Sequence, residues 1–323
     1  MLVLGAGYVA NAFLSGTSEG GFSIHISKNE TYDELRGELK NNICHFWAFD
    51  LYARYLKLSS RFKGGYYKFL PGENVRTIAK RIAIGDQNQI ALLITHKRQS
   101  QHMAEQIAEQ IEADYEDVLR ALRDGKNCSG MYAPCDSLFA FILPDTYFVF
   151  WNTEPNKLIK NLLKESERFF TPERLAKARE CSLSTKEVII LSSIVQEETS
   201  RQDDMLKIAA VYLNRLKKKH KLQACPTVRY AIQDFSMRRI LNRHLRYRSP
   251  YNTYLNNGLP PTPICTPTKQ AIDAVLNHDR NGYMFFCADA LNPGHTIFSK
   301  TLAEHNQASK RFRKKLDDLK IYK

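Results

Sequence analysis

An apolar segment near the middle of the chain, residues 184–199, ends in two consecutive glutamates. Ser184 to Glu187 have the capping-box pattern, so the sequence predicts a helix that begins at Ser184. Apolar residues then recur on one helix face at i, i+3 and i+7: Val188, Leu191 and Val195. Glu198 continues this face one turn later. The segment therefore predicts a core helix that carries a carboxylate on its apolar face.

A carboxyl at this position is expected to act as an acid near neutral pH. Burial against apolar surface disfavours the charged form, so the pKa of Glu198 should rise. A carboxyl that keeps its proton near neutral pH can serve as a general acid. Gln196 and Glu197 lie about 200° and 100° away around the helix and do not share this position. The alternative interpretation is that Glu198 is only the polar C-terminal edge of a core helix.

The chain of 323 residues is strongly basic, with 47 Lys and Arg against 34 Asp and Glu and a formal net charge of +13. Such a surface attracts polyanions, including nucleic acid, anionic lipid headgroups and cell-wall polymers that carry carboxylates. Nucleic acid is not expected as a partner, because no basic stretch interleaves aromatic residues in a stacking pattern. The basic stretches are residues 217–221, 238–248 and 311–315.

Cysteine and glycine motifs give no support for a metal site or a bound cofactor. The seven cysteines form no Cys-x-x-Cys pair, and the chain has no His-Glu-x-x-His motif. Cys128 and Cys135 share one loop and could pair outside the cytoplasm. Residues 5–10 match a dinucleotide-binding fingerprint, but only about eight helical residues follow and βαβ alternation is missing. A nucleotide-cofactor enzyme is therefore kept only as an alternative.

The pattern along the rest of the chain indicates an α+β protein. We expect strands at residues 22–27, 66–69, 90–95 and 283–288. We expect helical segments at residues 31–39, 75–84, 99–122, 156–180 and 205–216, and a basic helix from residue 302. Residues 2–14 are apolar but shorter than the roughly 20 residues that span a bilayer. They fit the tail of a membrane anchor, followed by a linker at residues 16–21.

Several segments resemble, in order, the motifs of one protein family. Residues 193–199 resemble the catalytic helix of the YceG-like, or MltG, family of endolytic murein transglycosylases. Further matching segments are residues 63–69, 143–147, 210–216, 222–230, 250–254, 258–261, 263–267, 294–299 and 302–306. The resemblance covers nearly the whole chain from about residue 22.

The resemblance implies an α+β architecture in three parts. Residues 1–21 would be the tail of a transmembrane anchor and its linker, residues 22–92 a small LysM-like module, and residues 93–323 a larger mixed α/β catalytic domain. The implied location is the bacterial cytoplasmic (inner) membrane, with a single span and the catalytic domain on the periplasmic or extracellular side. The implied partners are peptidoglycan glycan strands and cell-wall synthases, the penicillin-binding proteins.

The resemblance also implies site residues. The family's catalytic glutamate is the second acid of its Ile-Val-Glu-Lys-Glu-Thr motif, which falls on Glu198. The first acid of that motif is Gln196 here, and Cys225 stands where the family's Leu-Gln-x-Asp-Pro-Thr motif has Asp. Five further residues are candidates for substrate binding, with a structural role in the Pro-rich loops as the equal alternative. They are Gln223, Thr227, Asn252, Tyr254 and His295.

The implied activity is that of a lytic transglycosylase that cleaves the β-1,4 bond between MurNAc and GlcNAc inside glycan strands. It leaves 1,6-anhydro-MurNAc ends and so terminates strand elongation. One carboxyl suffices because the C6 hydroxyl of the muramic acid attacks its own anomeric carbon, whereas hydrolysis normally needs two carboxyls. The departures at Gln196 and Cys225 keep open a non-catalytic, peptidoglycan-binding scaffold of the same fold.

Overall fold

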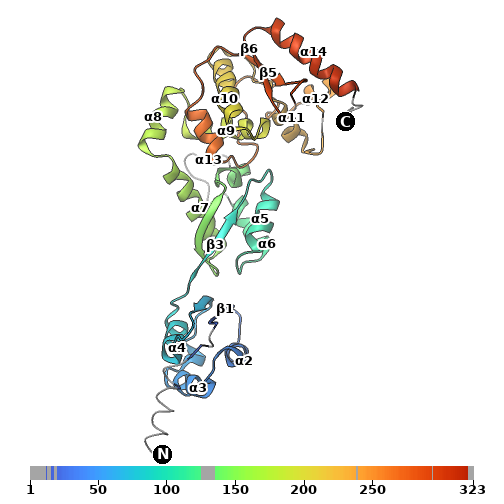
Figure 1. The fold of residues 1–323 in the computed structure, drawn as a ribbon. Coiled ribbons are helices and arrows are strands. Elements are labelled where there is room, and N and C mark those ends of the chain that lie inside the picture. Colours follow the sequence, from blue (N-terminus) through green and yellow to red (C-terminus); the bar gives the residue numbers. More distant parts are fainter. Residues whose placement is uncertain are drawn as a thin grey trace, which may run out of the picture. The chain divides into compact units, whose positions relative to one another are not determined.

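The structure, a computed structural model, describes residues 12, 16, 17, 20–124, 135–237, 239–292 and 294–318 (Figure 1). The chain forms two compact units. Unit 1 comprises Met1–Leu93, Glu105–Val118 and Thr146–Leu158, and unit 2 comprises Ile94–Ala104, Leu119–Asp145 and Ile159–Lys323. Unit 1 thus includes two segments that lie beyond the expected module of residues 22–92. Helices and two-stranded sheets occur in both units, which confirms the predicted α+β class.

Unit 1 contains two small sheets and the helices that pack against them. Its elements are β1 (Phe22–Ile26), α2 (Tyr32–Asn42), α3 (Phe46–Tyr55), the 3-10 helix η1 (Leu58–Ser60), β2 (Gly65–Phe69), α4 (Val75–Ile84) and most of β3 (Gln89–Ile94) and β4 (Asp145–Phe150). Strand β1 pairs antiparallel with β2, and β3 pairs with β4. Alternate residues of β1 and β2 point into a core shared with α2 and α4. They include Ile24, Ile26, Tyr67 and Phe69.

Two expectations for this part of the chain are corrected by the structure. Residues 46–55 form α3, which the pattern did not indicate, because its N-cap His45 makes no side-chain capping hydrogen bond. The single helical segment expected at residues 99–122 is two helices, α5 (Ser100–Ala108) and α6 (Tyr115–Arg123). Between them, Glu112 donates its N–H to Trp151 O (2.9 Å) and accepts from Ser27 Oγ (2.9 Å). Tertiary hydrogen bonds therefore interrupt the helix.

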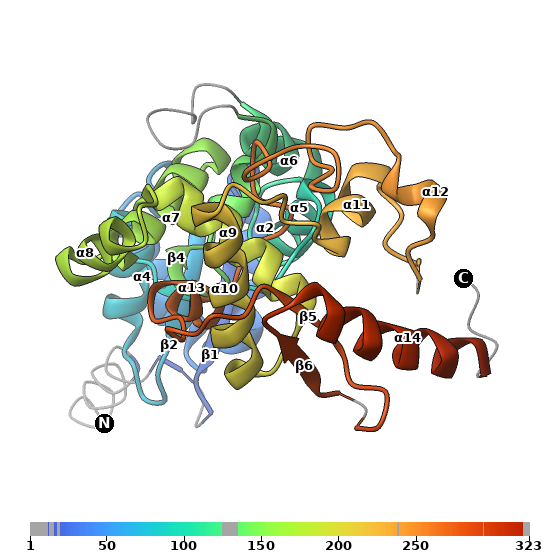
Figure 2. The same ribbon diagram turned by 90° about the horizontal axis from the view of Figure 1, so that it is seen from above.

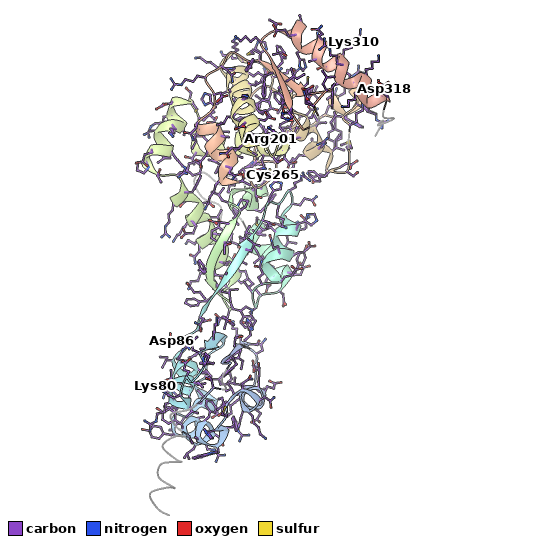
Figure 3. The ribbon with its side chains drawn as sticks, in the orientation of Figure 1. Lys80, Asp86, Arg201, Cys265, Lys310 and Asp318 are labelled. Carbon is purple, nitrogen blue, oxygen red and sulfur yellow. The ribbon has the colours of Figure 1, made fainter. Side chains whose placement is uncertain are left out.

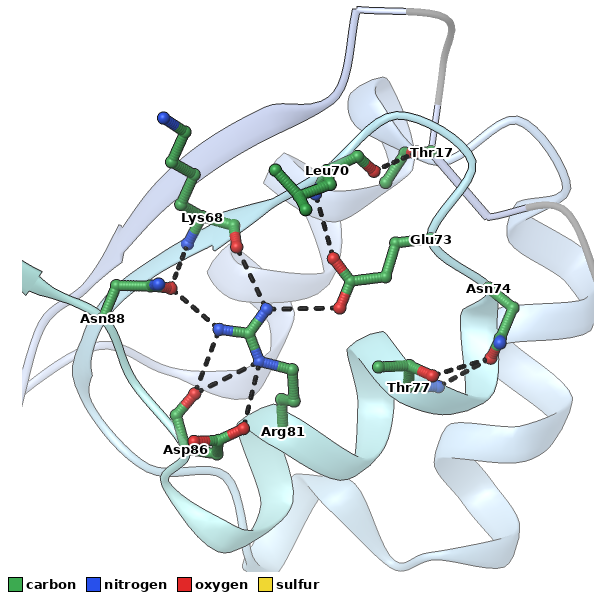
Figure 4. Close-up of polar contacts among 9 residues, drawn as sticks. All are labelled: Thr17, Lys68, Leu70, Glu73, Asn74, Thr77, Arg81, Asp86 and Asn88. Carbon is green, nitrogen blue, oxygen red and sulfur yellow. Dashed lines mark hydrogen bonds and ion pairs between the residues drawn. The ribbon is translucent and has the colours of Figure 1, made fainter.

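Arg81 of α4 joins several loops of unit 1, as Figure 4 shows. Its guanidinium donates to Lys68 O (3.0 Å), to Asn88 Oδ1 (2.8 Å) and to the Glu73 carboxylate (3.2 Å). It also pairs with the Asp86 carboxylate at 3.3 Å. The Arg81 and Glu73 side chains are mostly buried, at 16% and 17% exposed. Loss of the Arg81 side chain would therefore remove a hydrogen-bond or ion-pair partner from all four of these residues at once.

We expect Arg81→Ala to lower the free energy of unfolding of unit 1 by about 2–3 kcal/mol, because Glu73 Oε1 and the Lys68 carbonyl lose their charged donor in a mostly buried site. Denaturant titration of the full chain measures this change. Arg54→Ala is the matched control, since Arg54 is exposed and its ion pair with Asp50 (2.9 Å) should contribute less than about 1 kcal/mol. Equal losses in the two variants would contradict the interpretation.

Unit 2 is mainly helical. Its elements are η4 (Cys135–Phe141), α8 (Pro172–Glu180), α9 (Thr185–Glu198), α10 (Gln202–Lys217), α11 (Cys225–Ile232), α12 (Asn242–Leu245), α13 (Lys269–Leu276), β5 (Phe285–Ala288), β6 (Thr296–Ser299) and α14 (Leu302–Asp318), with most of α7 (Pro155–Phe169). Helices α9, α10 and α13 pack against one another at its centre (Figure 1). Helix α14 packs on the antiparallel β5–β6 sheet. This arrangement places α9 in the core.

The helical segment expected at residues 156–180 is also two helices, α7 and α8. Thr171 has extended backbone and its side chain accepts from the Arg174 N–H, so it acts as the N-cap of α8. Pro172 then occupies the first turn, where its missing N–H costs no hydrogen bond. Strand β5 is shorter than the expected 283–288, and the sequence did not predict β6 or α13.

Three predictions concern residues outside the described ranges. These are the membrane anchor on residues 2–14, of which only Ala12 is described, the dinucleotide fingerprint on residues 5–10, and the pairing of Cys128 with Cys135. Among the helices of the described ranges, none combines the length and the apolar character needed to cross a bilayer.

Candidate active site

Glu198 is the last residue of α9, at the point where this core helix ends. The capping box predicted at its start is present, because Ser184 Oγ accepts from the Glu187 N–H (3.3 Å) and the Glu187 carboxylate accepts from the Ser184 N–H (2.8 Å). Residues 188–195 are all buried. Thr199 has extended backbone, so the helix stops directly after Glu198. The core helix thus fixes the backbone from which Glu198 projects.

The carboxyl of Glu198 lies against Tyr212 of α10. The Tyr212 hydroxyl donates to Glu198 Oε1 at 2.6 Å. Burial raises the pKa of Glu198 to about 7, against the opposing effects of this hydrogen bond and of the positive charge of Arg229. The predicted rise in the pKa of Glu198 is confirmed. The alternative, that Glu198 is only the polar edge of the helix, does not fit a buried carboxyl. The residue as a whole keeps partial access to solvent.

Tyr212 is a fixed donor to this acid. Only 1% of its surface is exposed, and its ring packs edge-on against Phe286 of β5 with the ring centroids 5.6 Å apart. Burial and the neighbouring Glu198 raise the pKa of Tyr212 well above its usual value, so the hydroxyl keeps its proton. With Tyr212 bound to Oε1, the other oxygen of Glu198 is left to carry the acidic proton.

The adjacent glutamate, Glu197, has the opposite environment. Both of its carboxylate oxygens accept from Arg98 Nε at 2.9 Å, and His96 Nε2 lies 3.0 Å from Oε1. Burial opposes ionisation, but the hydrogen bonds from His96 and Arg98 outweigh it and hold the pKa of Glu197 below its usual range. The two consecutive carboxyls therefore titrate in different pH ranges: Glu197 is already ionised at neutral pH, whereas Glu198 keeps its proton up to a pH of about 7.

One group of potential metal ligands lies beside Glu197. The donor atoms of His96, Glu197 and Cys265 lie within 4.8 Å of one another. Of the three, Cys265 is labelled in Figure 3. Both Glu197 oxygens already bind the Arg98 guanidinium, and His96 Nδ1 lies 2.8 Å from Thr266 O. A metal ion here would face a fixed positive charge, and burial raises the pKa of the Cys265 thiol well above its usual value. We therefore assign this group to an ion-pair network.

Three residues of the 222–254 segment lie close to this site. Cys225 begins α11, and its Sγ lies 3.3 Å from the Tyr254 hydroxyl. Burial raises the pKa of both groups, and Glu198 contributes to the rise at each. The nearby Gln223 is exposed, has a left-handed backbone (φ 54°), and accepts from Arg215 Nη1 at 3.2 Å. Tyr254 and Gln223 thus remain candidates for contact with a ligand.

Thr227 and Asn252 are placed differently from the expectation of direct substrate contact. Both are fully buried. The Thr227 hydroxyl bonds to Thr253 Oγ1 (2.9 Å) and donates to Ala224 O (2.7 Å). The Asn252 side chain donates to two main-chain carbonyls of residues 245 and 247 and accepts from the Tyr254 N–H (2.9 Å). Their polar atoms are used inside the protein, so these residues position the loop that carries Tyr254.

His295 and Gln196 also take other positions. His295 is exposed in the turn between β5 and β6, where its main chain bonds to residues 289 and 292. Within the described contacts, nothing brings its ring to Glu198. Gln196 Oε1 accepts from the N–H and hydroxyl of Thr268, the N-cap of α13. Gln196 therefore joins α9 to α13, and it holds no proton for exchange.

Sequence reasoning missed four residues that surround the two glutamates: Tyr212, His96, Arg98 and Arg229. His96 and Arg98 lie 101 and 99 positions from Glu197 in the chain, so no local pattern links them to it. Tyr212 stands inside the 210–216 motif, but an aromatic residue in a core helix is more often packing than chemistry. Only the tertiary structure shows where its hydroxyl points.

An acid with a pKa of about 7, bound by a buried tyrosine at the end of a core helix, is the kind of group that enzymes use for general acid catalysis. Comparison with known families gives the particular assignment. The YceG-like family matches residues 24–311, and the chain belongs to this family.

Known relatives are similar over most of the chain. The endolytic murein transglycosylase of Bacillus subtilis is 28% identical over 308 residues, which cover 90% of this chain and 84% of that protein. The endolytic murein transglycosylase of Streptococcus pneumoniae serotype 2 is 25% identical, and the match covers 81% of this chain and 53% of that protein. A crystal structure of a YceG-like protein from Listeria monocytogenes has a TM-score of 0.59 at 25% identity, with 90% of this chain and 99% of that chain covered.

Proposed function

We propose that this protein is an endolytic murein transglycosylase. It would cleave the β-1,4 bond between MurNAc and GlcNAc inside glycan strands, leave 1,6-anhydro-MurNAc ends, and so end the elongation of nascent strands. The observation that carries the proposal is the position of Glu198 at the end of the core helix α9, where Tyr212 donates to its carboxyl and burial raises its pKa to about 7. The residue also keeps partial access to solvent. Relatives named for this activity support it.

The geometry explains why one carboxyl is enough. Hydrolysis normally places two carboxyls on opposite faces of the scissile bond. Glu197 cannot be the second, because it points about 100° away around α9 and both its oxygens bind Arg98. The transglycosylase reaction needs no second carboxyl, since the C6 hydroxyl of the muramic residue is the nucleophile. Glu198 then acts alone, first as acid and afterwards as base.

The reaction balances with a single proton carrier. Glu198 gives its proton to the glycosidic oxygen as the bond from C1 to that oxygen breaks. The C6 oxygen forms the new bond to C1, and the Glu198 carboxylate takes the proton that the C6 hydroxyl loses. Tyr212 stabilises the carboxylate between the two steps through its hydrogen bond to Oε1. Gln223 and Tyr254 are the described residues that we expect to contact the sugar.

Mass spectrometry of sacculi digested with the purified protein tests the proposal. We expect muropeptides with anhydro ends. They should be about 18 mass units, one water molecule, lighter than the reducing ends that hydrolysis would produce. Reducing ends would show a hydrolase instead. Release of no product, with glycan still bound, would favour the non-catalytic scaffold that the departures at Gln196 and Cys225 suggest.

The remaining parts of the proposal concern location and partners. The net charge of +13 suits attraction to the carboxylates of peptidoglycan stems and to an anionic membrane surface. We assign to the LysM-like module of residues 22–92 a second binding site for the glycan strand, which raises the effective concentration of substrate at Glu198. An N-terminal membrane anchor and contacts with penicillin-binding proteins complete the proposal, with the catalytic domain outside the cytoplasm.

A further inference from the structure

Arg229 is a cationic side chain close to Glu198 that the proposed reaction does not use. It lies on α11, which packs against α9, and it follows Cys225 by one helical turn. Helix α11 and the short helix α12 appear next to each other in Figure 2. The positive charge of Arg229 acts to lower the pKa of both Glu198 and Cys225, as expected for a guanidinium beside these two groups.

One N–H group of the Arg229 guanidinium is unsatisfied. Its Nε is buried and has no hydrogen bond within the described ranges. Other arginines pair with acidic side chains at the distances of good ion pairs, for example Arg98, Arg174 and Arg239 with Glu197, Asp273 and Asp317 at 2.9, 3.0 and 2.7 Å. The neighbouring Glu198 becomes charged only as the pH rises through about 7, so below that pH it does not neutralise Arg229. A partly buried, unpaired charge is costly unless a ligand completes the pair.

We propose that Arg229 binds a carboxylate of the substrate and thereby selects glycan strands that contain muramic acid. The inference rests on the proposed function, which makes the substrate peptidoglycan. Muramic acid differs from N-acetylglucosamine by a lactyl ether, whose carboxyl is either free or joined to a peptide stem that carries carboxylates of its own. The fork of N–H donors on a guanidinium matches a carboxylate in shape and charge. A polymer of N-acetylglucosamine alone offers Arg229 no such group.

Carboxylate binding at Arg229 would also favour the acid form of Glu198. In the unliganded protein the charge of Arg229 works against protonation of Glu198. A bound carboxylate neutralises that charge and removes the effect, so Glu198 keeps its proton more firmly when the correct glycan is present. Binding of the substrate carboxylate and protonation of Glu198 are thus coupled through Arg229.

Binding of three glycans by the full-length protein tests the proposal. Glu198→Gln is used as the background, so that no ligand is consumed, and Arg229→Met is added to remove the charge at similar size. The ligands are stem-bearing glycan strands, denuded strands with a free lactyl carboxylate, and neutral chito-oligosaccharides. We expect Arg229→Met to weaken binding of a carboxylate-bearing strand by roughly 10- to 100-fold and to leave chito-oligosaccharide binding unchanged. The strand that loses affinity shows whether the lactyl group or the stem supplies the carboxylate.

The control is Arg280→Ala, which removes one positive charge from an exposed arginine of unit 2 whose ion-pair partner is Glu180. It should not change affinity for any of the three glycans at physiological salt. Thermal unfolding separates binding from structure, because loss of an unpaired buried charge should leave Tm equal or higher. A lower Tm, an unchanged affinity for both carboxylate-bearing strands, or an equal loss for all three ligands would overturn the proposal. Absence of anhydro products from the unmutated protein would instead count against the transglycosylase activity.

Discussion

Replacing Glu198 with glutamine is expected to lower the release of anhydro-muropeptides by about 10²- to 10⁴-fold, the range associated with loss of a general acid. An amide has no acidic proton for the glycosidic oxygen and cannot take the proton of the C6 hydroxyl afterwards. It keeps the shape of the side chain, and its oxygen can still accept from Tyr212. Rates on purified glycan strands, followed by mass spectrometry, measure the loss.

The neighbouring glutamate gives the comparison variant. Glu197→Gln weakens the ion pair with Arg98 and His96, whose side chains are partly exposed, so we expect a loss of about 1–2 kcal/mol in the free energy of unfolding. Activity should fall far less than in Glu198→Gln. Full activity in Glu198→Gln, or a larger loss in Glu197→Gln at unchanged Tm, would show that Glu198 is not the acid.

Glu198→Gln should also change how the free energy of unfolding depends on pH. The pKa of Glu198 is raised to about 7 in the folded protein, whereas the ordinary value of 4.5 applies on unfolding. Its contribution to stability is therefore fully present below pH 4.5 and is lost as pH rises through about 7. Glu198→Gln removes this titration, so the variant should gain stability relative to the unmutated protein as the pH rises from 4.5 to about 7, and the difference should then stay constant at higher pH.

Local sequence signals predicted the elements that depend on short-range chemistry. The capping box of Ser184 and Glu187 marked the start of α9, and the apolar period placed Glu198 on its inner face. Helix α4 was likewise predicted over residues 75–84, where the side chain of Asn74 caps its first turn. Each of these signals lies within a few residues of the feature it specifies, which is why the sequence alone was sufficient.

Long-range contacts explain what the sequence did not show. The break between α5 and α6 depends on Glu112, which bonds to Ser27 from 85 positions away. The contrast between Glu197 and Glu198 depends on His96 and Arg98, from one distant segment of the chain, and on Tyr212 of α10. Thr227 and Asn252 stood in motifs that suggested substrate contact, and only the tertiary structure shows that both are buried and that their side chains form hydrogen bonds inside the protein.

Removing the hydroxyl of Tyr212 is expected to slow the reaction by roughly 10- to 100-fold, the equivalent of one hydrogen bond to a charged group. Tyr212 donates to Oε1 of Glu198, and this bond stabilises the carboxylate that exists between the two proton transfers. In Tyr212→Phe the buried carboxylate would lose that donor, while the apolar ring and its contact with Phe286 remain. The effect should therefore appear in kcat more than in KM.

The pH profile separates this role from simple packing. The hydrogen bond from Tyr212 lowers the pKa of Glu198, so its loss should raise that pKa above about 7. Since protonated Glu198 is the active form, kcat/KM of the unmutated protein should fall above pH 7, and in Tyr212→Phe this fall should move to higher pH. Tyr247→Phe, which changes a largely exposed tyrosine, should leave the profile in place. A rate loss in Tyr212→Phe with no shift, or with a shift to lower pH, would mean that the phenol supports the fold without tuning the acid.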